Sequence, residues 1–64
     1  MKWKEFERLA RDKGWYLFRH GSRHDIYRHT KRTDEMQIER HWSQEIRPRL
    51  LKKLLDQLNK GSNA

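Results

Sequence analysis

The stretch 19–29, RHGSRHDIYRH, decides the fold of this chain. Its Gly21-Ser22 pair is a turn signal between the apolar run 15–19, WYLFR, and the alternating run 25–29. Two strand-like runs on either side of a short turn predict a β-hairpin. The same stretch holds three histidines and three arginines, so we also expect the chemistry of the protein to lie here.

The two faces of the first strand look alike in the sequence. Trp15 and Leu17 share one face, and Tyr16 and Phe18 share the other, because side chains alternate along a strand. Both pairs are apolar, so either pair can face the core, which leaves the other to cover a partner or the far side of the sheet. The sequence does not distinguish these two arrangements.

A third strand follows the hairpin, and a helix precedes it. The polar residues 30–34 turn the chain again, and Met36 and Ile38 then alternate with polar residues as in a half-buried strand. Upstream, residues 2–13 predict an amphipathic helix that Gly14 ends. The apolar positions of that helix are Trp3, Phe6, Leu9 and Ala10.

A second helix is expected at the end of the chain. Residues 40–47 read as a polar connection, and Pro48 suits a first helical position, where its missing amide costs nothing. We expect Gly61 to end this helix. A leucine-zipper dimer is the alternative, but one short helix lacks the sustained heptads that a zipper requires. The leucines of the predicted core stripe are Leu50, Leu51, Leu54, Leu55 and Leu58.

Together these elements predict an α+β fold of order α-β-β-β-α. Three antiparallel strands with one apolar face need helices to cover them, so we expect both helices on one face of the sheet. A chain of 64 residues buries only a modest core, which indicates one domain, over residues 1–60. Residues 61–64 are expected to form a flexible C-terminal tail.

Charge is the strongest global signal. Sixteen Lys and Arg oppose nine Asp and Glu, which gives a net charge of +7 and a pI near 10.3. Such a balance suits a polyanionic partner. Basic residues recur in every segment and do not gather on one helix face, so a nucleic acid is favoured over a membrane surface.

The composition also bears on the compartment. The chain has no cysteine, which excludes disulfides and thiolate metal sites and suits a reducing cytoplasm. No apolar run of signal-peptide length opens the chain, and no window approaches the roughly 20 apolar residues of a membrane span. We therefore expect a soluble cytoplasmic protein without a membrane partner.

Four short motifs carry a family resemblance. They are Gly14-Trp15 at the first strand, GSRHDIY over Gly21 to Tyr27, Arg40-His41, and Glu45-Ile46 before the last helix. With these motifs and the order helix, three strands, helix, the chain resembles the HicA toxins, the YcfA-like family, over about residues 1–58. It departs from the family pattern at Arg23, where many members have histidine, and at Glu39, where many have proline.

The resemblance implies a fold, an activity and a partner. It implies a double-stranded-RNA-binding-domain-like fold and an endoribonuclease toxin, an mRNA interferase, that acts without the ribosome. It also implies a HicB-type antitoxin as the inhibitory partner, and charge complementarity independently favours an acidic partner domain. His24 takes the role of the single catalytic histidine, since it follows Gly21 and Ser22 at the family's spacing.

The same chemistry can be argued from the residues. RNA is cleaved when its own 2′-hydroxyl attacks the adjacent phosphorus, which needs a group that moves protons near neutral pH and cations that stabilise the developing charge. If the second strand includes His24, that side chain shares a face with Ile26 and leans toward the core side. Residues expected to contact RNA lie close in sequence: Ser22, Arg23, Arg28, Lys31 and Arg32.

Other readings of these residues remain open. His20, His29 and His41 are candidates for a second acid or base, but no two-histidine mechanism is assigned. Histidines spaced by four and five residues across a turn and a strand do not share a face, so we expect no metal and no cofactor. A non-catalytic RNA-binding module of the same fold is the alternative function. The aromatic residues for which packing is favoured over base stacking are Tyr16, Tyr27 and Trp42.

Overall fold

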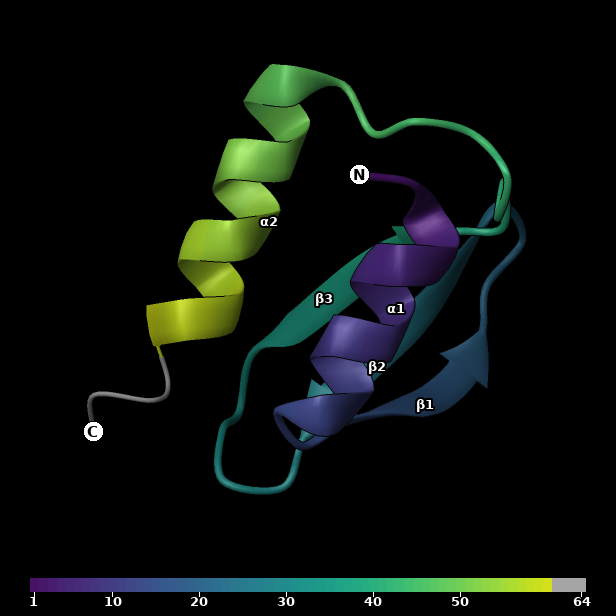
Figure 1. The fold of residues 1–64 in the computed structure, drawn as a ribbon. Coiled ribbons are helices and arrows are strands. Elements are labelled where there is room, and N and C mark those ends of the chain that lie inside the picture. The colour runs from purple at the N-terminus through teal and green to yellow at the C-terminus, as the bar shows by residue number, and fades with distance from the viewer. Residues whose placement is uncertain (61–64) are drawn as a thin grey trace.

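The computed structural model describes residues 1–60. Its elements are α1 (Trp3–Asp12), β1 (Trp15–His20), β2 (His24–His29), β3 (Glu35–Glu39) and α2 (Pro48–Lys60). The strands form one antiparallel sheet in the order β1-β2-β3, which confirms the predicted α-β-β-β-α fold (Figure 1). The predicted helix end at Gly61 and the predicted tail lie outside the described residues. No helix within residues 1–60 has the length and apolarity to cross a membrane.

The turn between α1 and β1 requires a glycine. Gly14 has a φ of +100°, in the left-handed region that side chains with a Cβ rarely adopt. A Cβ on Gly14 would lie 2.7 Å from Nε2 of His29, so the turn also packs closely against β2. At the other end of α1, the Glu5 carboxylate accepts a 2.8 Å hydrogen bond from the backbone N–H of Lys2, which satisfies a donor at the helix start.

The hairpin contains one irregularity in its register. Leu17 lies opposite Tyr27 and Arg19 lies opposite Ile26, so Phe18 is the extra residue of a β-bulge. At the turn, the backbone N–H of Gly21 donates to the His24 carbonyl oxygen at 2.7 Å. The strand β2 therefore begins at His24, one residue earlier than the alternating pattern indicated.

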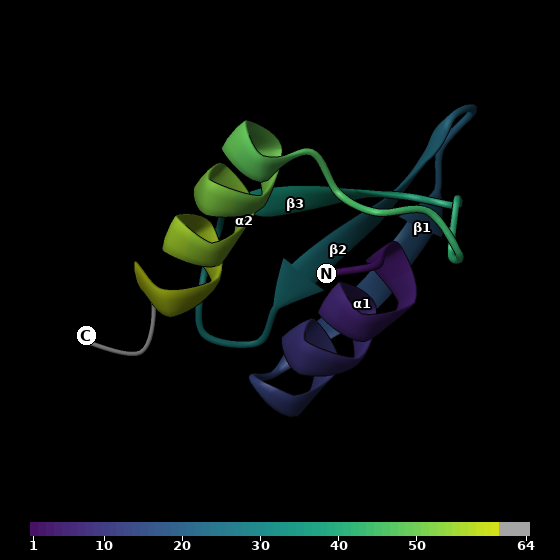
Figure 2. The same cartoon turned by 45° about the horizontal axis from the view of Figure 1, so that its top comes forward.

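The core lies between the sheet and the two helices. Figures 1 and 2 show α1 across one face of the sheet and α2 alongside β3. Trp15 and Leu17 face this core, which decides the question that the sequence left open. The buried core residues are Trp3, Phe6, Ala10, Trp15, Tyr27, Met36, Ile38, Ile46, Leu54 and Leu58.

The composition of residues 40–47 predicts a polar connection, but the structure shows that one of these residues belongs to the core. Ile46 is only 5% exposed and belongs to the core. Its backbone N–H donates to the Met1 carbonyl oxygen at 3.0 Å, and Lys2 forms an isolated β-bridge with Glu45. The start of the chain thus pairs with this connection and draws Ile46 inward, a long-range contact that local composition cannot reveal.

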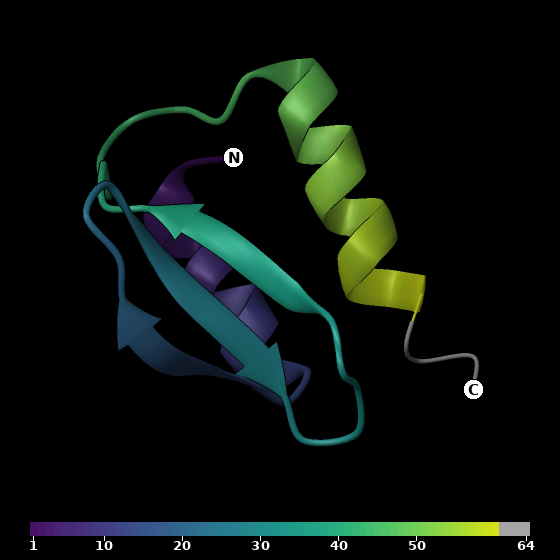
Figure 3. The ribbon, with the colours of Figure 1, turned by 180° about the vertical axis from the view of Figure 1, so that it is seen from behind.

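The opposite side of the sheet carries no helix, and Figure 3 views the molecule from that side. We call it the outer face. His24 shares it with Ile26, as expected, but the expectation that this face leans toward the core is wrong, because Asp25 and Tyr27 alternate with them on the core side. The residues of the outer face are Tyr16, Phe18, Arg19, His24, Ile26, Arg28, Glu35, Gln37 and Glu39.

A buried tyrosine links the sheet to α1. The Tyr27 hydroxyl donates to Oε2 of Glu7 at 2.7 Å, and the same carboxylate pairs with Arg11 one helical turn later. Burial, together with the hydrogen bond to Glu7, raises the pKa of Tyr27 from 10.0 to about 12. The neutral hydroxyl is therefore favoured in the folded protein.

This raised pKa predicts a loss of stability at alkaline pH. The folded state holds the Tyr27 proton more tightly than the unfolded state, so its contribution is complete below about pH 10 and is lost toward about pH 12. We expect the free energy of unfolding, measured by urea denaturation, to fall more steeply over this range in the wild type than in Tyr27→Phe. Equal pH slopes for the two proteins would contradict this role.

Candidate functional site

His24 occupies an accessible position at the start of β2. Its side chain is half-buried, and it lies directly opposite Glu39 in the register of β2 and β3. Two surface hollows meet here, and His24 and Glu39 line both. One, which we call the turn pocket, is also lined by Ser22, Arg23, Arg40 and His41. The other runs between β3 and α2, past Glu35, Gln37, Leu50, Lys53, Leu54 and Gln57.

The four histidines differ in how their rings are engaged. Nδ1 of His20 lies 2.8 Å from Oδ1 of Asp25, and Nε2 of His41 lies 3.8 Å from Oε1 of Glu39. Both ring nitrogens of His29 make hydrogen bonds. Within residues 1–60, the ring of His24 has no hydrogen bond or ion pair. Its ring therefore takes no part in a hydrogen bond or ion pair that holds the described part of the fold together.

His29 has a structural role. Nε2 lies 2.7 Å from the Lys13 carbonyl oxygen, and Nδ1 accepts from the backbone N–H of Lys31 at 3.0 Å. A neutral ring with its proton on Nε2 satisfies both contacts at once. The ring also meets Trp15 edge-on, with the ring centroids 5.4 Å apart. These contacts join the start of β1, the end of β2 and the turn after α1.

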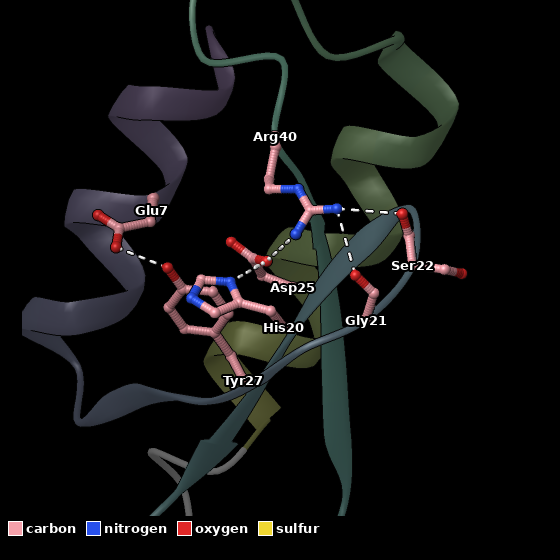
Figure 4. Close-up of polar contacts among 7 residues, drawn as sticks. All are labelled: Glu7, His20, Gly21, Ser22, Asp25, Tyr27 and Arg40. Atoms are coloured by element: carbon pink, nitrogen blue, oxygen red, sulfur yellow. Dashed lines mark hydrogen bonds and ion pairs between the residues drawn. The ribbon is translucent and has the colours of Figure 1, made fainter.

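The turn before His24 is held by a buried carboxylate (Figure 4). Asp25 is only 3% exposed, and its Oδ1 receives a 3.0 Å bond from Nη1 of Arg40 and the 2.8 Å contact from His20. Nη2 of Arg40 also donates to the carbonyl oxygens of Gly21 and Ser22, at 3.2 and 3.1 Å. We call these contacts the Asp25 clamp. They tie the turn to the residue that follows β3.

The predicted RNA-contacting residues divide into two groups. Ser22 and Arg23 are exposed at the turn beside His24, and Arg28 lies on the outer face farther along β2. Lys31 and Arg32 follow the opposite end of β2, which lies on the order of 17 Å from His24 at the rise of a strand. The structure therefore brings three of the five residues to the side of the sheet that carries His24.

Arg32 is engaged within the protein. Its Nε and Nη2 donate to the two carboxylate oxygens of Asp34 at 2.8 and 2.6 Å, and its Nη1 donates to the Gln57 carbonyl oxygen at 2.6 Å. Its Cζ lies 5.1 Å from the centroid of the Trp15 ring. Arg32 thus joins the turn between β2 and β3 to α2, and this pairing is not visible from its place in a basic run.

Three residues beside His24 were not predicted as site residues. Asp25 is part of the GSRHDIY motif, and the structure makes it a buried turn contact. In the sequence, Arg40 is notable only as part of the Arg40-His41 motif, and Glu39 only as a departure from the family pattern. The antiparallel register of β2 and β3 could have placed Glu39 opposite His24. Within the described part of the chain, no group of three or more His, Asp or Glu side chains is arranged to hold a metal ion.

The Asp25 clamp predicts a specific loss of stability. Asp25→Asn keeps the size of the side chain but removes the charge that Arg40 meets, and hydrogen bonds to charged groups contribute about 1.5 to 3 kcal/mol. We expect the free energy of unfolding in urea to fall by about that amount. The control is Asp56→Asn, an exposed carboxylate on α2, which should stay within about 0.5 kcal/mol of wild type. Equal effects of the two substitutions would argue against the clamp.

Comparison with known proteins identifies a family. A family model described as the HicA toxin of bacterial toxin-antitoxin systems matches residues 3–59, a range that runs from the first residue of α1 nearly to the end of α2. No curated protein and no solved structure matches the chain significantly.

Proposed function

The chain belongs to the HicA toxin family of bacterial toxin-antitoxin systems, and from this premise we propose that it is an endoribonuclease that cuts mRNA. In this proposal the protein acts without the ribosome and without a metal ion, and His24 is its single catalytic histidine. Membership of a toxin-antitoxin family also implies an antitoxin partner. We propose that this partner is of the HicB type.

The observation that best supports the proposal is that His24 lies at an accessible surface and that its ring makes no hydrogen bond or ion pair within residues 1–60. The other histidines contact Asp25, Lys13, Lys31 or Glu39, whereas the His24 ring makes no hydrogen bond or ion pair within residues 1–60. An acid or base has to be accessible and able to gain and lose a proton during the reaction. His24 is accessible at two surface hollows, and within residues 1–60 its ring nitrogens are not occupied by hydrogen bonds or ion pairs.

The proposed reaction uses the 2′-hydroxyl of the RNA as the nucleophile. His24 accepts the proton of that hydroxyl as its oxygen bonds to phosphorus, and the bond from phosphorus to the 5′-oxygen breaks. The departing oxygen takes a proton from solvent. The products are a 2′,3′-cyclic phosphate and a 5′-hydroxyl.

Cations near His24 support the same reaction. Arg23 lines the turn pocket with His24, where a guanidinium can stabilise the charge that develops on the phosphate oxygens. Ser22 and Arg28 are proposed to contact neighbouring phosphates. Lys31 would reach only phosphates farther along the RNA, and the internal contacts of Arg32 limit what it can add. The net charge of +7 favours RNA in general.

The antitoxin is proposed to be an acidic protein that covers the outer face around His24. Charge complementarity with a chain of net charge +7 speeds such an encounter and disfavours basic partners. Binding would also stabilise this small domain by mass action, because only the folded state is recognised.

The test of this proposal is the substitution His24→Asn. Asparagine cannot exchange protons near neutral pH, and general acid–base catalysis contributes about 10²-fold to 10⁴-fold, so we expect RNA cleavage to fall by at least about 100-fold. The melting temperature should stay unchanged because the ring has no partner within the described residues. Growth arrest on expression should be lost as well.

Two controls complete the experiment. Asp56→Asn, on the solvent side of α2, should cut RNA as the wild type does, and EDTA should leave wild-type cleavage unchanged. Analysis of the cleaved ends should find the cyclic phosphate. If folded wild type and His24→Asn both bind RNA but cut it equally poorly, the protein is a non-catalytic RNA-binding module and the proposal fails.

A further inference from the structure

Two large aromatic side chains of β1 are not used by the core. Tyr16 is 42% exposed and Phe18 is 46% exposed, while Trp15 and Leu17 on the same strand face the helices. Exposed aromatic side chains on one face of a sheet are costly to leave in water and commonly mark a binding surface. The proposed cleavage reaction requires neither ring.

Phe18 is held in place by a cation. Cζ of Arg28 lies 4.8 Å from the centroid of the Phe18 ring, within the range of a cation–π interaction. Arg28 is also the register partner of Tyr16. The Arg28 guanidinium thus lies over the Phe18 ring, and Arg28 is the neighbour of Tyr16 across the strands, so a positive charge accompanies two exposed aromatic side chains on the outer face.

The position of the two rings relative to His24 suits one bound RNA segment. Phe18 is the bulged residue, placed between the residues that lie opposite Ile26 and Tyr27. Those residues are two and three positions from His24, or about 7 to 10 Å along the strand. A base stacked on Phe18 would thus lie close to the phosphate at His24.

Charge divides the outer face into two halves. Arg19 and Arg28 lie on β1 and β2, with Arg23 at the adjoining turn, whereas Glu35 and Glu39 lie along β3. A phosphate backbone is attracted to the first half and repelled by the second. The aromatic rings occur in the first half, so the favourable path for RNA passes directly over them.

We propose that Tyr16 and Phe18 form a stacking platform for unpaired bases and that the substrate is single-stranded RNA or an unpaired loop. Aromatic rings stack on the faces of single-stranded bases, which a duplex hides. This inference rests on the proposed function and adds the class of RNA and the residues that select it.

The test measures RNA affinity in the His24→Asn background, where RNA is not cut. Fluorescence anisotropy compares a short single-stranded RNA with a duplex of the same sequence. Stacking contributes about 1 to 3 kcal/mol per base, so Phe18→Leu, which is apolar but lacks a ring, should weaken single-strand binding by about 5-fold to 150-fold. Phe18→Tyr should restore it, and duplex binding should change little. Tyr16→Leu and Tyr16→Phe form a second matched pair.

Several results would overturn the platform. One is equal single-strand affinity for the Leu and Tyr variants at position 18, and another is an equal loss for the duplex. If Phe18→Leu instead weakens only antitoxin binding, or turns a dimer into a monomer, the rings belong to a protein interface. In each case cleavage by the wild type would leave the proposed function standing. If the wild type itself cuts no RNA, the proposed function fails, whereas the platform fails only if the affinities of the position 18 variants show no dependence on the ring.

Discussion

The arrangement of this protein depends on one buried carboxylate. Asp25 lies on the core side of β2 at 3% exposure, and a charge in that position is tolerated only with close partners. Arg40 and His20 supply them, and Arg40 also binds the turn carbonyls. Because side chains alternate along a strand, holding Asp25 inward directs the preceding residue, His24, to the outer face. The same contacts fix the turn that precedes His24 and positions that residue.

The two faces of the sheet use their polar residues differently. On the core side, Tyr27 is paired with Glu7 and His29 with Lys13, and Arg32 is paired with Asp34 beyond the end of β2. A chain of 64 residues without cysteine has a modest core, and these pairs add connections between segments far apart in the sequence. The outer face carries the exposed aromatic rings and His24, whose ring has no hydrogen bond or ion pair within residues 1–60, and the proposed function assigns binding and chemistry to that side.

Much of the fold could be predicted because local patterns specify it. The Gly21-Ser22 turn, the alternation of Met36 and Ile38, and the start of α2 at Pro48 were all readable from the sequence and are confirmed. The orientation of β1 could not be predicted, because Trp15 and Tyr16 both belong to apolar pairs. Their assignment depends on packing against helices that are distant in the chain.

The candidate site could be predicted only in part. The position of His24 followed from the turn and the family pattern, and its role stays a prediction. Arg40 and Asp25 are 15 residues apart, and their contact exists only once the register of β2 and β3 is fixed. Arg32 appeared to be one more free cation in a basic run, and its contacts with Asp34 and Gln57 depend on where α2 docks. Such contacts are properties of the tertiary structure.

The most direct measurement is a structure of the protein bound to a short single-stranded RNA whose 2′-hydroxyls are methylated, so that it cannot be cut. We expect a phosphate within hydrogen-bond distance of the His24 ring, and an RNA path over the half of the outer face formed by β1 and β2. RNA bound across α1 or α2, with His24 in contact with solvent alone, would contradict the assignment of the outer face as the active surface.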